Sequence, residues 1–199
     1  MEAQAFSFTS SPFVPIAIGF FGLSTGYLIW GGQTLFQFPK AGPEVNKSLG
    51  LWGFWMPGFM QFLTGIYLLV GLTWFNVFGH AAPLYMAALA FTAYGIHWFA
   101  MAHRRYINSS VQADGYMAIA FLFLSILGVH VFRQAGDIPV MIIFVGLTFI
   151  YAIEVPTHLL GWNLGHRLIG LFQVLTAIWL MYCTYAITTD LALGAKAWI

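Results

Sequence analysis

Charged residues are scarce in this sequence, and their scarcity excludes an ordinary soluble protein. Only 7% of the 199 residues are Asp, Glu, Lys or Arg, whereas soluble domains carry about 25%. Too few charges remain to coat a water-facing surface, and the net charge of +1 indicates no nucleic-acid partner. Hydrophobic residues make up 60% of the chain and the mean hydropathy is +0.82, so we expect the lipid bilayer to be its solvent.

Cysteine pairs and catalytic motifs are also missing. The single cysteine, Cys183, excludes an internal disulfide. The chain has no CxxC or HExxH pattern, and no pairing of a nucleophile with a base is recognisable. We therefore expect the protein not to be an enzyme and to bind no metal or cofactor.

Long apolar stretches are what the sequence does contain. About 20 apolar residues in a helix cross the roughly 30 Å of bilayer hydrocarbon. Six stretches reach or approach that length: approximately 13–30, 49–72, 81–102, 116–132, 138–155 and 164–187. Pro57 should kink the second, and Asp137 before Pro139 is typical of a helix N-cap. The sequence predicts an all-α polytopic membrane protein with one transmembrane domain, residues 1–199, and a first loop long enough for a short interfacial helix.

A faint internal repeat favours two inverted three-helix halves. Residues 16–28 (IAIGFFGLSTGYL) resemble 117–129 (MAIAFLFLSILGV), and LTGIY at 63–67 resembles LTFIY at 147–151. Three helices are an odd number, so a repeat of this kind would sit inverted in the membrane, as in many transporters. Chance similarity between apolar segments is the alternative explanation.

The basic residues are distributed unequally between the two sides of the predicted bundle. One side carries five of them and the other two, Arg133 and Lys196; the five are Lys40, Lys47, Arg104, Arg105 and Arg167. Basic residues concentrate on the cytoplasmic side. This distribution predicts that both termini lie outside.

Polar side chains recur within the apolar stretches, where each costs free energy. They are Ser24, Thr25, Gln61, Thr64, Thr92, Thr148, Gln173 and Thr176. Hydrogen bonds between helices explain any single one of them, but their presence on most helices suits a narrow polar-lined path. Glu154, near the end of the fifth stretch, lies on the same membrane side as Arg167. It either forms an ion pair with Arg167 or handles protons.

Three short segments together resemble the acetate uptake transporter family, the succinate–acetate permeases. The stretch PFVPIAIGFFGLST at 12–25 is similar to the family's N-terminal signature, with identities at Pro15, Phe21, Gly22 and Thr25. QFLTG at 61–65 and FTAYG at 91–95 resemble family motifs of the second and third helices. Departures from the family pattern, such as Leu68 in place of a glutamate, make this chain a divergent member.

The resemblance implies a channel or transporter for small monocarboxylates such as acetate. It implies six helices per subunit, a hexamer with one pore per protomer, and a location in a bacterial inner membrane. It also implies that the N-terminus lies in the cytoplasm, whereas the distribution of basic residues predicts that it lies outside. The narrowest point would be an apolar ring of Phe21, Tyr94 and Leu147. Such a ring accepts a methyl group and resists water and ions. The residues expected to line the path are Pro15, Ser24, Thr25, Gln61 and Thr92, together with the Tyr94 hydroxyl.

Two other functions remain open at this stage. The long first loop and the aromatic surface would also suit a non-transporting accessory subunit of a larger membrane complex. The six histidines suggest a haem- or quinone-binding redox subunit. However, His97 and His130 are predicted on opposite sides of the membrane, which speaks against a shared haem. The identity of the acid, and the choice between channel and proton-coupled carrier, stay undecided.

Overall fold

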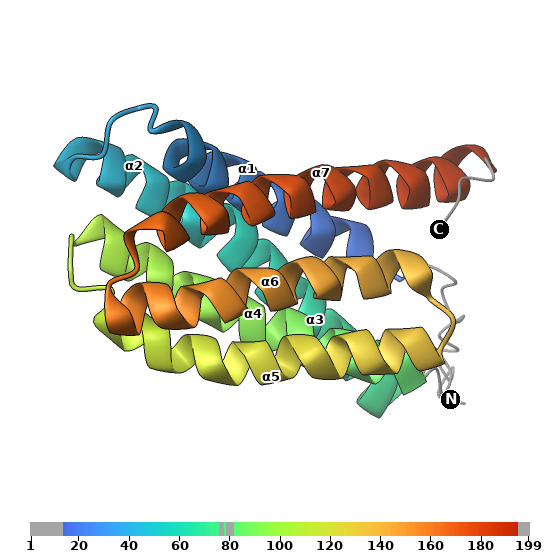
Figure 1. Cartoon of the computed structure of the whole chain (residues 1–199). Helices are drawn as coiled ribbons and strands as arrows, with labels where there is room; N and C mark the ends of the chain where they lie inside the picture. Colours follow the sequence, from blue (N-terminus) through green and yellow to red (C-terminus); the bar gives the residue numbers. More distant parts are fainter. Residues whose placement is uncertain (1–13, 76–77, 79–81, 195–199) are drawn as a thin grey trace, which may run out of the picture.

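The computed structural model describes residues 14–75, 78 and 82–194, and its long helices lie side by side in one bundle (Figure 1). The elements in chain order are α1 (Ile16–Phe36), α2 (Pro43–Gly53), the π-helical η1 (Phe54–Phe59), α3 (Met60–Val70), the π-helical η2 (Gly71–Phe75), α4 (Ala82–Tyr106), α5 (Gln112–Gln134), α6 (Ile138–Leu160) and α7 (Asn163–Leu193). The predicted all-α class is confirmed.

Within the described residues, five helical segments are long and apolar enough to cross a membrane. They are Pro43–Phe75, Pro83–Tyr106, Gln112–Gln134, Ile138–Leu160 and Asn163–Leu193. Helix α1 is not among these segments, but its 21 residues extend over about 31 Å at 1.5 Å per residue. Together these six segments form the predicted polytopic bundle.

The second predicted helix begins earlier than expected and contains a π-helical turn. Segments α2 to η2 follow one another without a break, so the expected interfacial helix of the first loop is instead the start of this long helix. Pro57 lies inside η1. A proline cannot donate the backbone hydrogen bond of an α-helix, and a π-turn absorbs that interruption. Helix α1 packs tightly here: a Cβ on Gly26 would lie 2.5 Å from Pro57 Cγ.

The other helices extend beyond the predicted ends, mostly at the side that carries the basic residues. Helix α1 continues to Phe36 rather than residue 30, and α4 to Tyr106 rather than residue 102. The indole N–H of Trp30 donates to the carbonyl of Leu49 at 2.8 Å, which ties α1 to α2. The first loop is therefore short and docked. The Asp137 cap is confirmed, since its Oδ1 accepts from the N–H of Val140 at 3.1 Å.

In both halves of the chain, a glycine of one helix packs closely against a threonine of its neighbour. Helix α1 packs along α7, α6 packs against α5 and α7, and α3 packs against α4. A Cβ on Gly65 of α3 would collide with Thr92 of α4, and one on Gly146 of α6 would collide with Thr176 of α7. The offset of 84 positions that relates LTGIY at 63–67 to LTFIY at 147–151 also relates Thr92 to Thr176. The inverted repeat itself stays a prediction.

Candidate functional site

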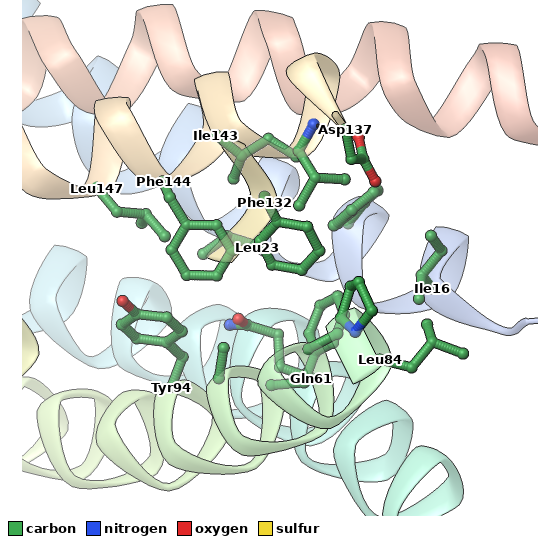
Figure 2. Close-up of a pocket in the computed structure, with 16 residues that line it drawn as sticks. Ile16, Leu23, Gln61, Leu84, Tyr94, Phe132, Asp137, Ile143, Phe144 and Leu147 are labelled. Atoms are coloured by element: carbon green, nitrogen blue, oxygen red, sulfur yellow. Dashed lines mark hydrogen bonds between the residues drawn. The ribbon is translucent and has the colours of Figure 1, made fainter. Parts of the chain in front are cut away.

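An apolar cavity of about 100 Å³ lies between α1, α3, α4, α5 and α6. Figure 2 shows Gln61 and Tyr94 facing Phe144 and Leu147 across it. The helices place these residues by periodicity: Phe144 and Leu147, three positions apart, share one face of α6. Among the lining residues that the structure describes, the polar side chains are Gln61, Tyr94 and, where α6 begins, Asp137.

A second cavity, of about 420 Å³, lies toward the other ends of the same helices and is polar. Its lining includes Arg104 and Arg105 from the end of α4, Glu154 and His158 from the end of α6, and Gln173 from α7. The two cavities therefore lie at different levels along α1, α4 and α6.

A layer of buried aromatic side chains separates the cavities. It consists of Tyr27 from α1, Trp98 from α4 and Tyr151 from α6, and we call it the aromatic layer. The rings of Tyr27 and Trp98 lie 5.6 Å apart, and the Tyr151 ring stacks on Tyr94 at 5.9 Å. On α6 the layer lies between Leu147 and Glu154, seven residues apart, so it is about 10 Å thick. A solute that crosses this protein by the cavities must pass these rings.

The ring expected from the family resemblance is only partly assembled. Tyr94 and Leu147 are buried and line the apolar cavity, but Phe21 is 40% exposed on the outer face of α1. Phe20, only 5% exposed, lines the cavity and packs against Phe91 with ring centres 5.6 Å apart. One residue along a helix turns the side chain by about 100°. A motif match identifies the segment, whereas its rotation follows from the packing of α1 against its neighbours.

Of the polar residues expected to line the path, Gln61 and Tyr94 line the apolar cavity in the part of the chain that the structure describes. Ser24 donates to the carbonyl of Ala177 on α7 at 3.1 Å. Thr25 and Thr92 each donate to the carbonyl four residues earlier in their own helix, at 2.8 Å. Pro15 precedes the first turn of α1 and lines neither cavity. Ser24 therefore forms a hydrogen bond between helices, which was one of the two explanations, whereas Thr25 and Thr92 bond within their own helices.

Gln61 and Tyr94 have well-defined hydrogen bonds. The amide Nε2 of Gln61 donates to the carbonyl of Pro57 at 3.0 Å, and its Oε1 is buried without a partner in the described structure. The Tyr94 hydroxyl lies 2.8 Å from Ser125 Oγ, which itself donates to the carbonyl of Phe121 at 2.7 Å. Because Ser125 has one proton and uses it on Phe121, Tyr94 is the donor to Ser125.

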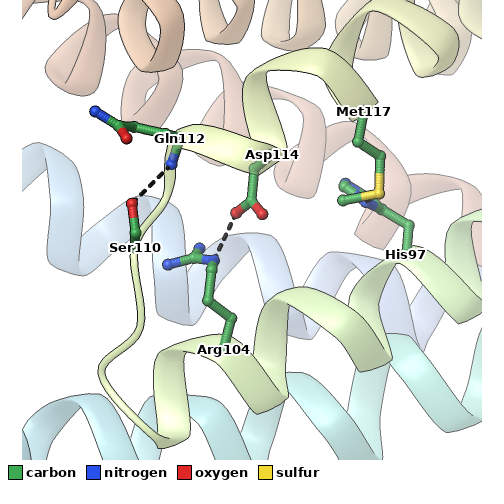
Figure 3. A network of polar contacts seen from close by, with 6 residues as sticks. All are labelled: His97, Arg104, Ser110, Gln112, Asp114 and Met117. Carbon is green, nitrogen blue, oxygen red and sulfur yellow. Dashed lines mark hydrogen bonds and ion pairs between the residues drawn. The ribbon is translucent and has the colours of Figure 1, made fainter.

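Charges surround the polar cavity in an arrangement that the sequence did not predict. Arg104 Nε lies 2.6 Å from Asp114 Oδ2, across the connection between α4 and α5 (Figure 3). Arg105 donates to Gln33 Oε1 at 2.7 Å and lies over the Trp30 ring, 4.6 Å from its centre. The sequence contained only a weak signal for the ion pair between Arg104 and Asp114: a short polar loop follows the basic residues, and a single acidic residue comes after it.

The predicted ion pair between Glu154 and Arg167 is wrong. Within the described residues the ion pairs are Arg104–Asp114 and the exposed Lys47–Glu44. Glu154 is 7% exposed and lines the polar cavity, whereas Arg167 lies on an exposed face of α7. Residues on the same side of a membrane still point in different directions, and only the helix rotations decide whether they meet.

His97 and His130, the two histidines considered for a shared haem, differ in burial and environment. His97 is buried, stacks on Phe121 and places Nδ1 3.2 Å from Met117 Sδ (Figure 3), while His130 is exposed. The described residues contain no group of three or more His, Cys, Asp or Glu side chains placed to hold a metal ion. His80 and Lys196 lie outside the described residues.

Asp137 occupies the end of the apolar cavity, between α5 and α6. Burial raises the pKa of its carboxyl above the usual range, and the hydrogen bond from Val140 partly offsets the effect. The N–H groups of Ile138 and Met141 are also bonded, to the carbonyls of Gly136 and Asp137. The first turn of α6 therefore has its donors occupied.

Comparisons with known proteins agree with this architecture at the level of the fold. No protein-family model and no curated protein matches the sequence. Among solved structures the chain is similar to the bacterial acetate channel SatP, with a TM-score of 0.77 and 14% sequence identity over 95% of this chain and 99% of that one. The fold expected from the family resemblance is thus confirmed, and the matching structure is a channel rather than an enzyme.

Proposed function

Because this chain has the fold of a bacterial acetate channel, we propose that it is a membrane channel or carrier for small monocarboxylates such as acetate. The observation that carries the proposal is the succession of an apolar and a polar cavity along α1, α4 and α6, separated by the aromatic layer.

The two cavities suit the two ends of a short fatty acid. Arg105 in the polar cavity attracts a carboxylate from water, and the open polar space keeps it hydrated. Phe20, Tyr94 and Leu147 of the apolar cavity accept a methyl group without loss of hydrogen bonds. An inorganic ion would lose its hydration shell there at a high cost in free energy. This combination favours small amphiphilic acids.

Assembly and location are part of the same proposal. The family resemblance favours a hexamer in a bacterial inner membrane with one path in each protomer. Exposed apolar side chains on the outer face of α1, including Ile18, Phe21 and Leu28, can contact either lipid or a neighbouring subunit.

Uptake of labelled acetate into liposomes that contain the purified protein tests the function. We expect uptake above that of empty liposomes, and loss of selectivity between acetate and larger acids in Leu147→Ala. The control variant Leu63→Ala removes the same side chain from an exposed position of α3 and should behave as the unmodified protein. Uptake equal to that of empty liposomes refutes the proposal. Stoichiometric foreign chains after mild detergent extraction would then favour the accessory-subunit alternative.

A further inference from the structure

A groove of about 250 Å³ lies on the outside of the bundle, where α2 and η1 pack against α4. Its floor is a close approach of the two backbones, since a Cβ on Gly50 would lie 2.7 Å from the carbonyl oxygen of Ala102. The described residues that line it are Gly50, Leu51, Phe54, Trp55, Ala102, His103 and Tyr106. None of them lines the apolar or the polar cavity, so the groove is separate from the proposed path.

The groove is apolar along most of its length and reaches the membrane surface at one end. Phe54 and Trp55 are exposed at the inner end, and the Phe54 ring packs on Phe99 of α4 with ring centres 4.5 Å apart. At the other end the span Pro43–Phe75 begins and the span Pro83–Tyr106 stops. This end therefore lies at the level of the lipid headgroups, on the side that carries most of the basic residues.

Side-chain hydrogen-bond donors gather at the headgroup end of the groove. His103 and Tyr106 line it, and Lys47 lies one turn before Leu51 on the same face of α2. A histidine ring, a tyrosine hydroxyl and a lysine ammonium can each donate. The Glu44 carboxylate lies 3.7 Å from the Lys47 ammonium, but this pair is exposed and contributes little. The groove end thus offers donors and a positive charge to a ligand that accepts hydrogen bonds.

We propose that this groove binds an anionic phospholipid, with its phosphate at Lys47 and His103 and an acyl chain along Phe54 and Trp55. The inference is independent of the solute that the protein transports. A phosphodiester accepts hydrogen bonds and carries one negative charge, which matches the donors of the headgroup end. A zwitterionic lipid brings the same phosphate together with a cationic group that the Lys47 ammonium repels. Net charge therefore decides which lipid binds.

A second copy of this chain fits the headgroup end less well than a lipid does. Lys47 would need an acidic partner on the same side of the membrane, where the described acidic residues are Glu44, Asp114 and Glu154. Asp114 is paired with Arg104, and Glu154 is buried. Glu44 already lies beside Lys47 in its own chain. An anionic headgroup, in contrast, is available to every protomer at this level of the bilayer.

Brominated phospholipids test the proposal, because bromine on an acyl chain quenches the fluorescence of nearby tryptophan. The protein is reconstituted into phosphatidylcholine with increasing fractions of brominated phosphatidylglycerol, and into phosphatidylglycerol with increasing fractions of brominated phosphatidylcholine. The difference between the unmodified protein and Trp55→Phe isolates the signal of the groove. We expect phosphatidylglycerol to bind about fivefold more tightly than phosphatidylcholine, as one lysine at an anionic headgroup predicts. Salt at about 0.5 M should reduce this preference.

The matched variants are two lysine substitutions on the same membrane side. Lys47→Gln should bring the two lipids close to equal binding, whereas Lys40→Gln, at an exposed position outside the groove, should leave the preference unchanged. An equal loss in both variants would overturn the assignment to this groove.

The unmodified protein decides the question even if a variant fails to fold. Equal quenching by the two brominated lipids would overturn the proposal, since the groove would then hold the surrounding lipid without preference. Absence of quenching by either lipid would also overturn it, and would indicate that a protein surface, such as a second copy of this chain, covers the groove.

Discussion

Phe20 and Phe21 offer a matched pair that tests which face of α1 lines the path. The two side chains are identical and adjacent, but Phe20 is 5% exposed and lines the apolar cavity, whereas Phe21 is 40% exposed on the outside. The motif resemblance assigns the constriction to Phe21, and the geometry favours Phe20. We therefore predict that Phe20→Ala alters transport and Phe21→Ala does not.

The size of the effect follows from the space that the ring fills. Removing the Phe20 ring roughly doubles the cavity volume of about 100 Å³ unless the helices close around it. A buried Phe→Ala change costs about 3–5 kcal/mol in soluble proteins, and the cost depends on how far the site can collapse. The opened cavity should admit butyrate-sized acids at rates close to that of acetate, with acetate uptake maintained or raised.

Competition between labelled acetate and unlabelled butyrate or benzoate, in liposomes with equal amounts of folded protein, measures this selectivity. Size-exclusion profiles before reconstitution show whether both variants fold. The opposite result, altered selectivity in Phe21→Ala with none in Phe20→Ala, would show that the cavity described here is not the path. It would also mean that the solute passes along the outer face of α1, where a neighbouring subunit would have to form the other wall of the path.

Three further predictions concern stability and pH, and thermal unfolding in detergent checks each of them. Gly65→Ala should unfold at a clearly lower temperature, because its Cβ would lie 2.5 Å from a backbone nitrogen of α4. In the control Gly32→Ala the new Cβ would have no atom within 4 Å, so this variant should be as stable as the unmodified protein or slightly more stable. Asp114→Asn should cost about 3 kcal/mol by leaving the Arg104 guanidinium without its partner, and Arg104→Gln in the same chain should restore part of the loss. The raised pKa of Asp137 means that the folded state binds a proton more tightly than the unfolded state does. The contribution of this group to stability is therefore greatest at low pH and is lost as the pH rises through its folded pKa. Asp137→Asn should remove this pH dependence and keep the helix cap. A steeper pH dependence in Asp137→Asn would contradict the reasoning.

Features that depend on neighbouring residues along the chain were predicted well. The six apolar stretches became the helices of the bundle, and Asp137 caps α6 as expected from its place before Pro139. Pro57 was correctly identified as an interruption, although a π-helical segment accommodates it. Helix length, capping and proline effects are local properties, so the sequence contains the information directly.

Features that depend on helix rotation were predicted poorly. Thr25 and Thr92 bond to their own helices, Phe20 takes the place expected for Phe21, and Glu154 does not meet Arg167. Nearly every face of these helices is apolar, because both lipid and the protein interior accept apolar side chains. The hydrophobic pattern that orients a helix in a soluble protein is therefore weak here.

By itself the sequence determined that this chain resides in a bilayer, and which stretches of it form the membrane-crossing helices, since charge content and apolar length decide those matters. Only the tertiary structure decided that buried tyrosine and tryptophan rings lie between an apolar and a polar cavity, and that the side-chain carbonyl of Gln61 in the apolar cavity is left unpaired. The reason is that tight helix contacts, such as Gly65 on Thr92, set each helix's rotation through packing between residues far apart in the chain.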